Sequence, residues 1–304
     1  VEGPCVMADY TVSFSTLKNG HLLQPAKGCC GQVVVVPIGI DLSLINSQES
    51  PLEVTDRETA LQALKPRNPE SNKGDYGRLF CLCGSEGMAG AASLCVRAAL
   101  RGGAGLVNAV LPRSIYQIVA GQATEAIYTL LDYSAPGTLT EDSQRSLAEA
   151  LRKADAMVLG CGLSTNRESS ALFRQCLMGA EKPIVIDADG INLLARNIDI
   201  LKTVQAPLVL TPHPGEMARL TGRSVAEIQL HRLESAREFA REYQVVLVLK
   251  GAGTIVAEPS GHAWVNQTGN AGMARGGSGD VLAGLIGALL AQGCAPAQAA
   301  AAAV

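Results

Sequence analysis

Charged residues are scarce in this sequence, and it contains no cluster of charges of one sign. Only 17% of the 304 residues are charged, the formal net charge is -3, and lysine and arginine are scattered along the chain. Nucleic acids and anionic membranes bind to concentrated positive charge. We therefore expect no nucleic-acid partner, no membrane partner, and ligands that are small molecules.

Paired cysteine spacings are also missing. The nine cysteines are odd in number and mostly lie inside apolar runs, whereas zinc sites and disulfide frameworks use paired spacings. The sequence therefore assigns no metal ligand. A buried free cysteine is usually a small hydrophobic residue, although Cys83 or Cys161 could instead be a nucleophile. This usage is typical of a reducing cytoplasm, where we expect the protein to reside.

No signal peptide, low-complexity tract or short internal repeat is apparent. The most apolar segment, residues 281–290, is about half as long as a bilayer-spanning helix. With 47% apolar residues the chain can bury a large core, and we expect a soluble globular protein. The sequence opens on Val1 without a methionine and closes on AAAV within a helical pattern. We therefore expect a piece of a longer chain, truncated at both ends.

From Arg78 onward, short β-rich runs alternate with helical patterns. The expected strands are residues 78–83, 105–112, 155–160, 183–187 and 207–211, and each precedes an expected helix: 89–102, 113–121, 167–179, 188–197 and 215–222. This alternation predicts an α/β fold with a mostly parallel sheet and helices on both faces. Three shorter strands, within residues 245–251, 254–260 and 262–266, follow at one edge. Ligands of such folds bind at the carboxyl ends of the strands.

The first part of the chain is organised differently. Residues 1–40 hold one strand-like run, VVVVPIGI, and residues 41–71 show little periodicity. Clusters of proline, glycine and polar residues of this kind are typical of linkers. The predicted division is residues 1–45, a linker and domain start at 46–72, and a main domain at 73–304.

Polar residues follow two of the expected strands where a core would select apolar ones. Asp187 and Asp189 lie in VIDADG at the carboxyl end of one strand, and His213 and Glu216 lie in TPHPGE after the next. Either aspartate could instead be a helix N-cap, and His213 could cap the helix that carries Glu216. Otherwise His213 could hydrogen-bond a substrate or act as an acid or base.

Glycine-rich turns follow other strands. GSEGMAGAA at 84–92 and GCGL at 160–163 would let the backbone approach a ligand closely, or could be tight strand-to-helix turns. In KGAGT at 250–254, Lys250 could meet a phosphate and Thr254 could offer a hydroxyl. The alternative for that segment is a hairpin turn with a solvated lysine.

The sharpest signal is GGSGD, residues 276–280, in front of an apolar helix. Its glycines keep side chains away as the backbone turns into the helix, so the N-H groups of Gly277, Ser278 and Gly279 can form an anion hole. Asp280 lies in the first helical turn. A carboxylate beside an anion site suits phosphoryl transfer, where it takes the proton of the attacking hydroxyl. The alternative for Asp280 is a favourable first-turn charge with no catalytic role.

Together these motifs resemble a known family. GGSGD, KGAGT, TPHPGE, VIDADG, KGDYG and GSEGMAGAA occur in the order seen in the ADP- or ATP-dependent NAD(P)H-hydrate dehydratases, which have a ribokinase-like three-layer α/β/α fold. The resemblance runs from about Lys73 to the end. Residues 1–40 resemble the last strands of the NAD(P)H-hydrate epimerase domain that is fused ahead of the dehydratase in many bacteria. Only the missing part of that domain would use K⁺.

The resemblance implies roles for individual residues. The nucleotide-binding residues would be Lys250, Gly251, Ala252, Gly253, Thr254 and Gly279. The residues on the hydrated nicotinamide nucleotide would be Ala91, Gly162, His213 and Asp280, with Asp280 as the catalytic base. Ala271 and Arg275 depart from the residues that the family often has beside this site.

The activity that the resemblance implies is nicotinamide nucleotide repair. The C6 hydroxyl of NADHX or NADPHX would be phosphorylated, and loss of phosphate would restore NADH or NADPH, so that the enzyme is a hydro-lyase. ADP is the expected co-substrate, ATP the alternative, with Mg²⁺ on the phosphates. We expect a homo-oligomer and an upstream epimerase in the parent chain. Two other hypotheses are a ribokinase-like kinase of a small hydroxylated metabolite and an inactive scaffold.

Overall fold

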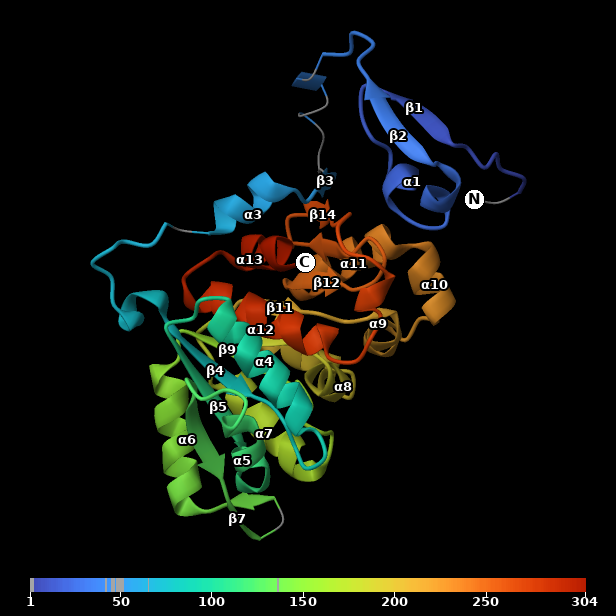
Figure 1. Cartoon of the computed structure of the whole chain (residues 1–304). Coiled ribbons are helices and arrows are strands. Elements are labelled where there is room, and N and C mark those ends of the chain that lie inside the picture. The colour runs from blue at the N-terminus through green and yellow to red at the C-terminus, as the bar shows by residue number, and fades with distance from the viewer. Residues whose placement is uncertain (1–2, 42, 45–46, 48–51, 65, 136) are drawn as a thin grey trace.

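A ten-stranded sheet forms the centre of the computed structural model (Figure 1). The structure describes residues 3–41, 43–44, 47, 52–64, 66–135 and 137–304. The strand order is β3-β14-β13-β12-β11-β10-β9-β4-β5-β6. The bounds are β3 (Leu52–Val54), β4 (Arg78–Leu82), β5 (Leu106–Pro112), β6 (Ile127–Leu131), β9 (Ala156–Leu159), β10 (Ile184–Ile186), β11 (Leu208–Leu210), β12 (Val246–Leu249), β13 (Ile255–Ala257) and β14 (Ala263–Val265).

Most neighbouring strands of this sheet are parallel, and β12, β13 and β14 form an antiparallel meander at one end. The predicted α/β fold with a mostly parallel sheet is therefore confirmed, including the irregular edge. Strand β3 pairs in parallel with β14. Part of residues 41–71, the segment with little periodicity, thus extends the sheet of the main domain.

Helices cover both faces, because successive strand residues point to opposite sides of a sheet. In β4, Leu79 and Cys81 join the core on one face, and Phe80 and Leu82 join the core on the other. The first face carries α4 (Ala89–Arg101), α5 (Tyr116–Ala120), α12 (Ser278–Ala291) and α13 (Pro296–Ala303). The second carries α6 (Glu141–Lys153), α7 (Arg167–Met178), α8 (Asp189–Leu194), α9 (Pro214–Thr221), α10 (Val225–Leu230) and α11 (Arg232–Tyr243).

Helix α12 packs closely on α4 and on the sheet because two of its glycines lie where a side chain would not fit. A Cβ on Gly284 would lie 2.2 Å from the backbone oxygen of Cys95, and one on Gly287 would lie 2.4 Å from Val158 Cγ2. This contact holds the N-terminus of α12 over the carboxyl ends of the central strands.

The structure adds elements that periodicity did not reveal. Strand β6 and helix α6 stand between α5 and β9, and a small hairpin of β7 (Tyr133–Ala135) and β8 (Thr138–Leu139) joins them. The remaining short elements are α3 (Arg57–Ala63), η2 (Lys73–Tyr76), η3 (Arg113–Ile115), η4 (Ile198–Thr203) and η5 (Ala271–Met273). Among the described residues, no helix is long and apolar enough to cross a membrane.

Residues 10–36 form a separate small unit that lies beyond the end of the sheet formed by β3 and β14 (Figure 1). It holds a parallel pair, β1 (Tyr10–Phe14) and β2 (Gln32–Val36), with α1 (Asn19–Leu22) and η1 (Ala26–Cys29) between them. The expected single strand at 33–40 is therefore wrong in two respects: a second strand precedes it, and β2 ends at Val36 because Pro37 has no N-H for the ladder.

The small unit contacts the main domain through Leu22 and Lys27. Leu22 is buried with the main core, and Gln267 Nε2 donates to the Leu22 carbonyl at 3.2 Å. The Lys27 ammonium donates to Gln267 Oε1 at 2.5 Å.

Candidate active site

A buried ion pair joins two strand ends. Asp187 follows β10 and Lys250 follows β12, and Lys250 Nζ lies 2.7 Å from Asp187 Oδ1. The same oxygen accepts a hydrogen bond of 2.7 Å from the Thr211 hydroxyl, which follows β11. Burial alone would lower the pKa of Lys250, but the carboxylates of Asp187 and Glu216 outweigh it and raise that pKa. Lys250 is therefore a fixed cation and not a solvated turn residue.

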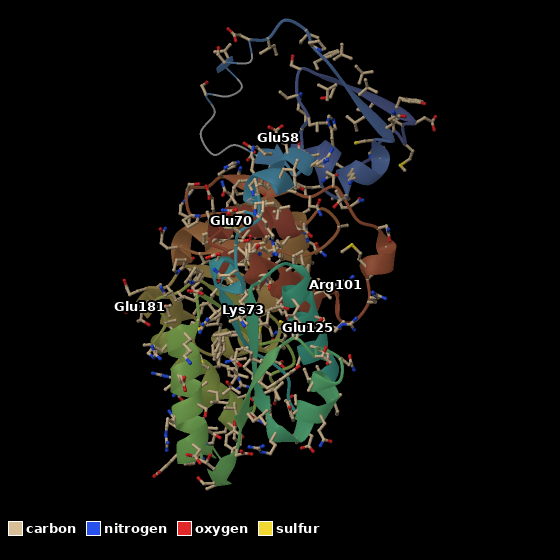
Figure 2. All side chains as sticks on the ribbon, turned by 60° about the vertical axis from the view of Figure 1, so that its left-hand side comes forward. Glu58, Glu70, Lys73, Arg101, Glu125 and Glu181 are labelled. Atoms are coloured by element: carbon tan, nitrogen blue, oxygen red, sulfur yellow. The ribbon has the colours of Figure 1, made fainter. Side chains whose placement is uncertain are left out.

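Most other charged side chains lie on the outside. Figure 2 labels six of them, and all six are exposed: Glu58, Glu70, Lys73, Arg101, Glu125 and Glu181. Asp187, by contrast, is only 1% exposed. A carboxylate and an ammonium group taken out of water cost folding energy, and such groups are found most often where chemistry needs them.

The N-terminus of α12 rests on this ion pair. A Cβ built on Gly279 would lie 3.3 Å from Asp187 Oδ2 and 3.3 Å from Lys250 Nζ, so a side chain there would press on both charges. Gly277 is the N-cap residue with a φ of 97°, and a Cβ there would lie 2.5 Å from Leu94 Cδ1. The first-turn N-H groups of a helix have no acceptor within it. Gly277, Ser278 and Gly279 thus lie at a helix start that favours an anion, next to Lys250.

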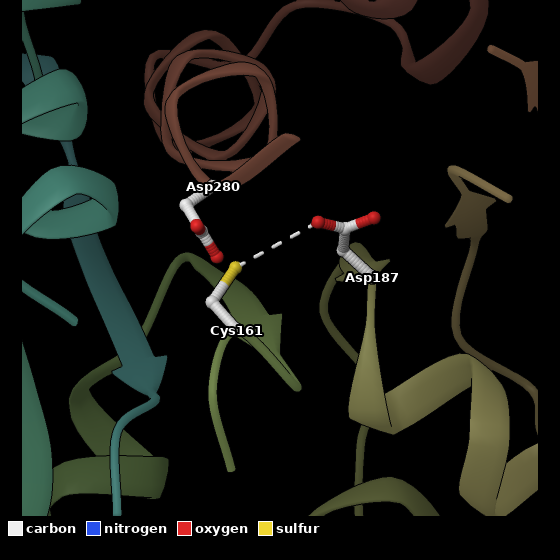
Figure 3. A group of neighbouring side chains, drawn as sticks. All are labelled: Cys161, Asp187 and Asp280. Carbon is white, nitrogen blue, oxygen red and sulfur yellow. Dashed lines mark hydrogen bonds between the residues drawn. The ribbon is translucent and has the colours of Figure 1, made fainter. Parts of the chain in front are cut away.

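Asp280 points from this helix start toward Asp187 and Cys161 (Figure 3). One ligand atom of each of the three residues lies within 4.8 Å of the other two. Burial, followed by the repulsion of Asp187, raises the pKa of Asp280 to about 6. Asp280 is thus poised to exchange a proton near neutral pH, as a general base must.

Cys161 is not suited to be a nucleophile. Its thiol is fully buried, and Sγ lies 4.0 Å from Asp187 Oδ2. Although a hydrogen bond with Cys95 favours the thiolate, burial and the neighbouring carboxylates raise the pKa of Cys161 to about 12. Only a thiolate attacks efficiently, so Cys161 packs beside the site as a neutral group.

His213 and Glu216 cap helix α9. His213 Nδ1 accepts from the N-H groups of Gly215 and Glu216 at 3.0 and 3.3 Å, and Glu216 Oε2 accepts from His213 N at 2.8 Å. The capping alternative for His213 is therefore what the structure shows. Nδ1 is occupied as an acceptor, which leaves the proton on Nε2 and half of the side chain exposed. Glu216 Oε2 lies 3.8 Å from Lys250 Nζ, so this capping group borders the ion pair.

Asp189 holds a loop. Its Oδ2 accepts from Ser164 N at 2.7 Å, which fixes the turn after β9. The N-cap of α8 is Ala188, with no side-chain hydrogen bond, so neither Asp187 nor Asp189 is a helix cap. In the same turn Gly162 has a φ of 60°, and a Cβ there would lie 2.7 Å from Ala91 Cβ. Gly162 and Ala91 are thus side by side at the start of α4.

The loop after β12 lies at the surface beside the ion pair. Gly251 and Ala252 are exposed, Gly253 and Thr254 are half-buried, and the Thr254 hydroxyl donates to the Gly251 carbonyl at 3.0 Å. Ala271 and Arg275, the two departures from the family pattern, are exposed just ahead of α12.

Two polar residues of this region were missed by sequence reasoning. Thr211 fixes Asp187, and buried Arg232 lies beneath the loop after β12. The signal for Arg232 is its spacing, since it shares a helix face with the buried residues Ala236, Phe239 and Ala240. A charged residue on an apolar helix face requires polar partners.

The chain is similar to known proteins over most of its length. The profile of the NAD(P)H-hydrate dehydratase family matches residues 79–304. A bifunctional NAD(P)H-hydrate repair enzyme from Moorella thermoacetica is 42% identical over 299 residues, covering 98% of this chain and 56% of that protein. The chain thus spans about half the length of this bifunctional relative.

This chain matches two shorter proteins over most of their own length. An ADP-dependent (S)-NAD(P)H-hydrate dehydratase from Neisseria meningitidis serogroup B is 37% identical, with 78% of this chain and 77% of that protein covered. The ADP/ATP-dependent NAD(P)H-hydrate dehydratase of Bacillus subtilis, crystallised with ATP/Mg²⁺, has a TM-score of 0.70 and 32% identity, with 83% and 85% covered. The chain belongs to the NAD(P)H-hydrate dehydratase family and has its ribokinase-like fold.

Proposed function

We propose that this chain carries out the ADP-dependent dehydration of (S)-NADHX and (S)-NADPHX to NADH and NADPH. Its relatives are named for that reaction and for NAD(P)H-hydrate repair. The observation that carries the proposal is the position of Asp280, a carboxylate with a pKa raised to about 6 at a glycine-lined helix start beside Lys250.

The steps follow from that position. Asp280 takes the proton of the C6 hydroxyl as its oxygen bonds to the terminal phosphorus of ADP, and the bond from that phosphorus to the AMP oxygen breaks. The ring nitrogen then supplies an electron pair as the C6-O bond breaks, which releases phosphate and leaves an iminium ion. Loss of a proton from C5 to the solvent then forms the C5-C6 double bond and restores the dihydronicotinamide. The sum is NADHX and ADP giving NADH, AMP and phosphate.

The surrounding residues would bind and orient the two substrates. Lys250 and the backbone of Gly277, Ser278 and Gly279 would hold the transferred phosphoryl group, because cations and helix N-termini stabilise anions. The loop from Gly251 to Thr254 would hold the rest of the nucleotide. Ala91, Gly162 and His213 would contact NAD(P)HX, with His213 donating from Nε2.

The donor set fits a magnesium ion. Asp187 Oδ2, which the Cys161 thiol contacts at 4.0 Å, is a hard ligand, and Mg²⁺ in nucleotide sites is usually held by one or two carboxylates together with phosphate oxygens, so Asp280 can stay unliganded as the base. Bound there, Mg²⁺ would neutralise charge on the phosphates. The Cys161 thiol adds a soft, protonated neighbour that does not suit this ion.

We also propose that residues 1–45 are the tail of an epimerase domain and that residues 46–72 lead into the dehydratase domain of residues 73–304. The parallel pair β1-β2 supports this, since most of its residues are exposed although parallel strands are normally covered on both faces.

The buried thiols of Cys81, Cys83 and Cys95 suit a reducing cytoplasm. We expect a homo-oligomer that acts on small molecules alone.

The test uses the return of reduced-nicotinamide absorbance from NADHX with ADP and Mg²⁺. Asp280→Asn should reduce the rate about 10³-fold, as loss of a general base does, while ADP binding persists. Asp142→Asn is a matched control, because Asp142 also lies in the first turn of a helix but is exposed. If neither ADP nor ATP restored absorbance with a folded, nucleotide-binding protein, dehydration would be the wrong reaction; a stable phosphate ester would then identify a kinase.

A further inference from the structure

Arg232, the first residue of α11, reaches beneath the loop that follows β12. Its guanidinium donates through Nη2 to the carbonyls of Leu249 at 3.1 Å, Lys250 at 3.4 Å and Gly253 at 3.2 Å. Nη1 donates to the Lys250 carbonyl at 3.4 Å and to Gln229 Oε1 at 3.0 Å. One planar group thus connects both ends of the loop.

The environment of this guanidinium is unusual. Arg232 is only 5% exposed, and among the described residues no carboxylate lies within ion-pairing distance of it. Nε is buried without a hydrogen-bond partner in that part of the chain. A buried charge that is compensated by carbonyl dipoles alone is costly, so a simple stabilising role explains it poorly.

The carbonyl contacts determine which way the loop's N-H groups point. In a trans peptide the carbonyl and the following N-H point in opposite directions. Because the Lys250 and Gly253 carbonyls face Arg232, the N-H groups of Gly251 and Thr254 face away from it. Gly251 has a φ of 145°, and a Cβ there would lie 2.8 Å from Arg232 Nη1, so this close approach also requires glycine.

We propose that Arg232 is a positioning residue that shapes residues 250–254 for nucleotide binding by holding the loop carbonyls inward. This inference rests on the proposed function, in which the loop binds ADP. Outward N-H groups in consecutive turns form anion-binding concavities. Arg232 itself does not touch the nucleotide, and its effect is transmitted by the backbone.

Three variants separate geometry from charge and from folding. Arg232→Lys keeps the charge but loses the planar fork. Gln229→Leu removes the exposed amide that orients Nη1. Arg232→Met removes the group. Arg241→Met, an exposed arginine on the same helix, is the matched control.

We expect Arg232→Lys to raise the ADP dissociation constant and the KM for ADP about tenfold, equivalent to about 1.4 kcal/mol, with kcat within about twofold of the wild type. Gln229→Leu should raise the ADP dissociation constant and the KM for ADP about twofold to threefold. The effect is smaller because this variant removes only one hydrogen bond of the guanidinium. KM for NADHX should not change, and Arg241→Met should match the wild type. A merely structural role would lower thermal stability without this split between KM and kcat.

The outcomes are distinguishable. Unchanged ADP affinity in both Arg232→Lys and Gln229→Leu would overturn the inference, even if Arg232→Met fails to fold. These two variants should fold, because the first keeps a long cationic side chain at position 232 and the second changes an exposed residue. A wild-type protein that is folded but binds no ADP would overturn the proposed function and this inference with it. Weakened ADP binding with preserved kcat in the Arg232→Lys and Gln229→Leu variants supports the proposed function and the positioning role of Arg232.

Discussion

Lys250 Nζ and Asp187 Oδ1 lie 2.7 Å apart although the two residues are 63 positions apart in the chain. β11 separates their two strands in the sheet, so the pair bridges over the end of that strand. The N-terminus of α12 sits directly on it, since a Cβ on Gly279 would be 3.3 Å from either partner. The anion site therefore contains a positive charge whose position is set by a buried carboxylate.

Lys250→Met should destabilise the fold as well as weaken nucleotide binding. It would leave the buried Asp187 carboxylate without its counter-ion, which typically costs about 3 kcal/mol in the free energy of unfolding. Urea unfolding at neutral pH measures the loss. The double variant Asp187→Asn with Lys250→Met should recover part of it, because Asp187 is then neutral while buried Glu216 still lacks the neighbouring cation.

The matched control is Lys202→Met, which breaks the exposed pair with Asp199. Such surface pairs contribute less than about 1 kcal/mol. Equal losses of unfolding free energy in the two lysine variants would show that Lys250 does not compensate the charge of the Asp187 carboxylate.

The rate of dehydration should depend on the ionisation of Asp280. A general base must be deprotonated, so kcat/KM should rise through a pKa of about 6 and fall about tenfold per pH unit below it. A profile from pH 5 to 8 tests this, with intrinsic fluorescence as the control for folding. A flat profile in that range would contradict the assignment of Asp280 as the base.

Asp280→Asn should stabilise the protein above pH 6. The pKa of Asp280 is raised from 3.8 to about 6 in the fold, mainly by burial, so the contribution of this group to stability is present below 3.8 and is lost as pH rises through 6. The variant avoids that loss. After allowance for solvent screening we expect about 1 kcal/mol, or about 2 °C in Tm, at pH 8.

The same comparison at a pH below about 3 should show almost no difference in Tm, because this is well under the unfolded pKa of 3.8 and Asp280 is then largely neutral in both states. A variant that is less stable than the wild type at pH 8 would mean that the carboxylate makes favourable contacts that outweigh its burial.

Gly284→Ala should damage both stability and activity. Its Cβ would lie 2.2 Å from the Cys95 backbone oxygen, so α12 would have to move away from α4. Overpacking of this kind costs about 2 kcal/mol. Because α12 carries Asp280, kcat should fall as well. Gly90→Ala in α4 is the control, since a Cβ there meets nothing within 4 Å; it should be neutral or stabilising by up to about 1 kcal/mol. Unchanged activity in Gly284→Ala would separate the packing of α12 from catalysis.

The sequence by itself determined the α/β fold and the neighbourhood of Asp280. Alternating apolar runs and helical patterns depend on residues close together in the chain, and so does the glycine cluster ahead of α12. Strand β1 was missed although Tyr10, Val12 and Phe14 alternate with two polar residues in the pattern of a strand. Strand β6 and helix α6 were missed because β6 is an edge strand with a mixed pattern, and α6 is a strongly polar helix.

Only the tertiary structure decided which polar residues work together. His213 and Asp189 look alike in sequence as polar residues after strands, yet His213 caps α9 and Asp189 holds the Ser164 turn. The pairing of Asp187 with Lys250, the raised pKa of Asp280 and the reach of Arg232 all depend on strand order and burial. Those are properties of residues that are distant in the chain, and no local pattern encodes the distance or the solvent exclusion that sets their chemistry.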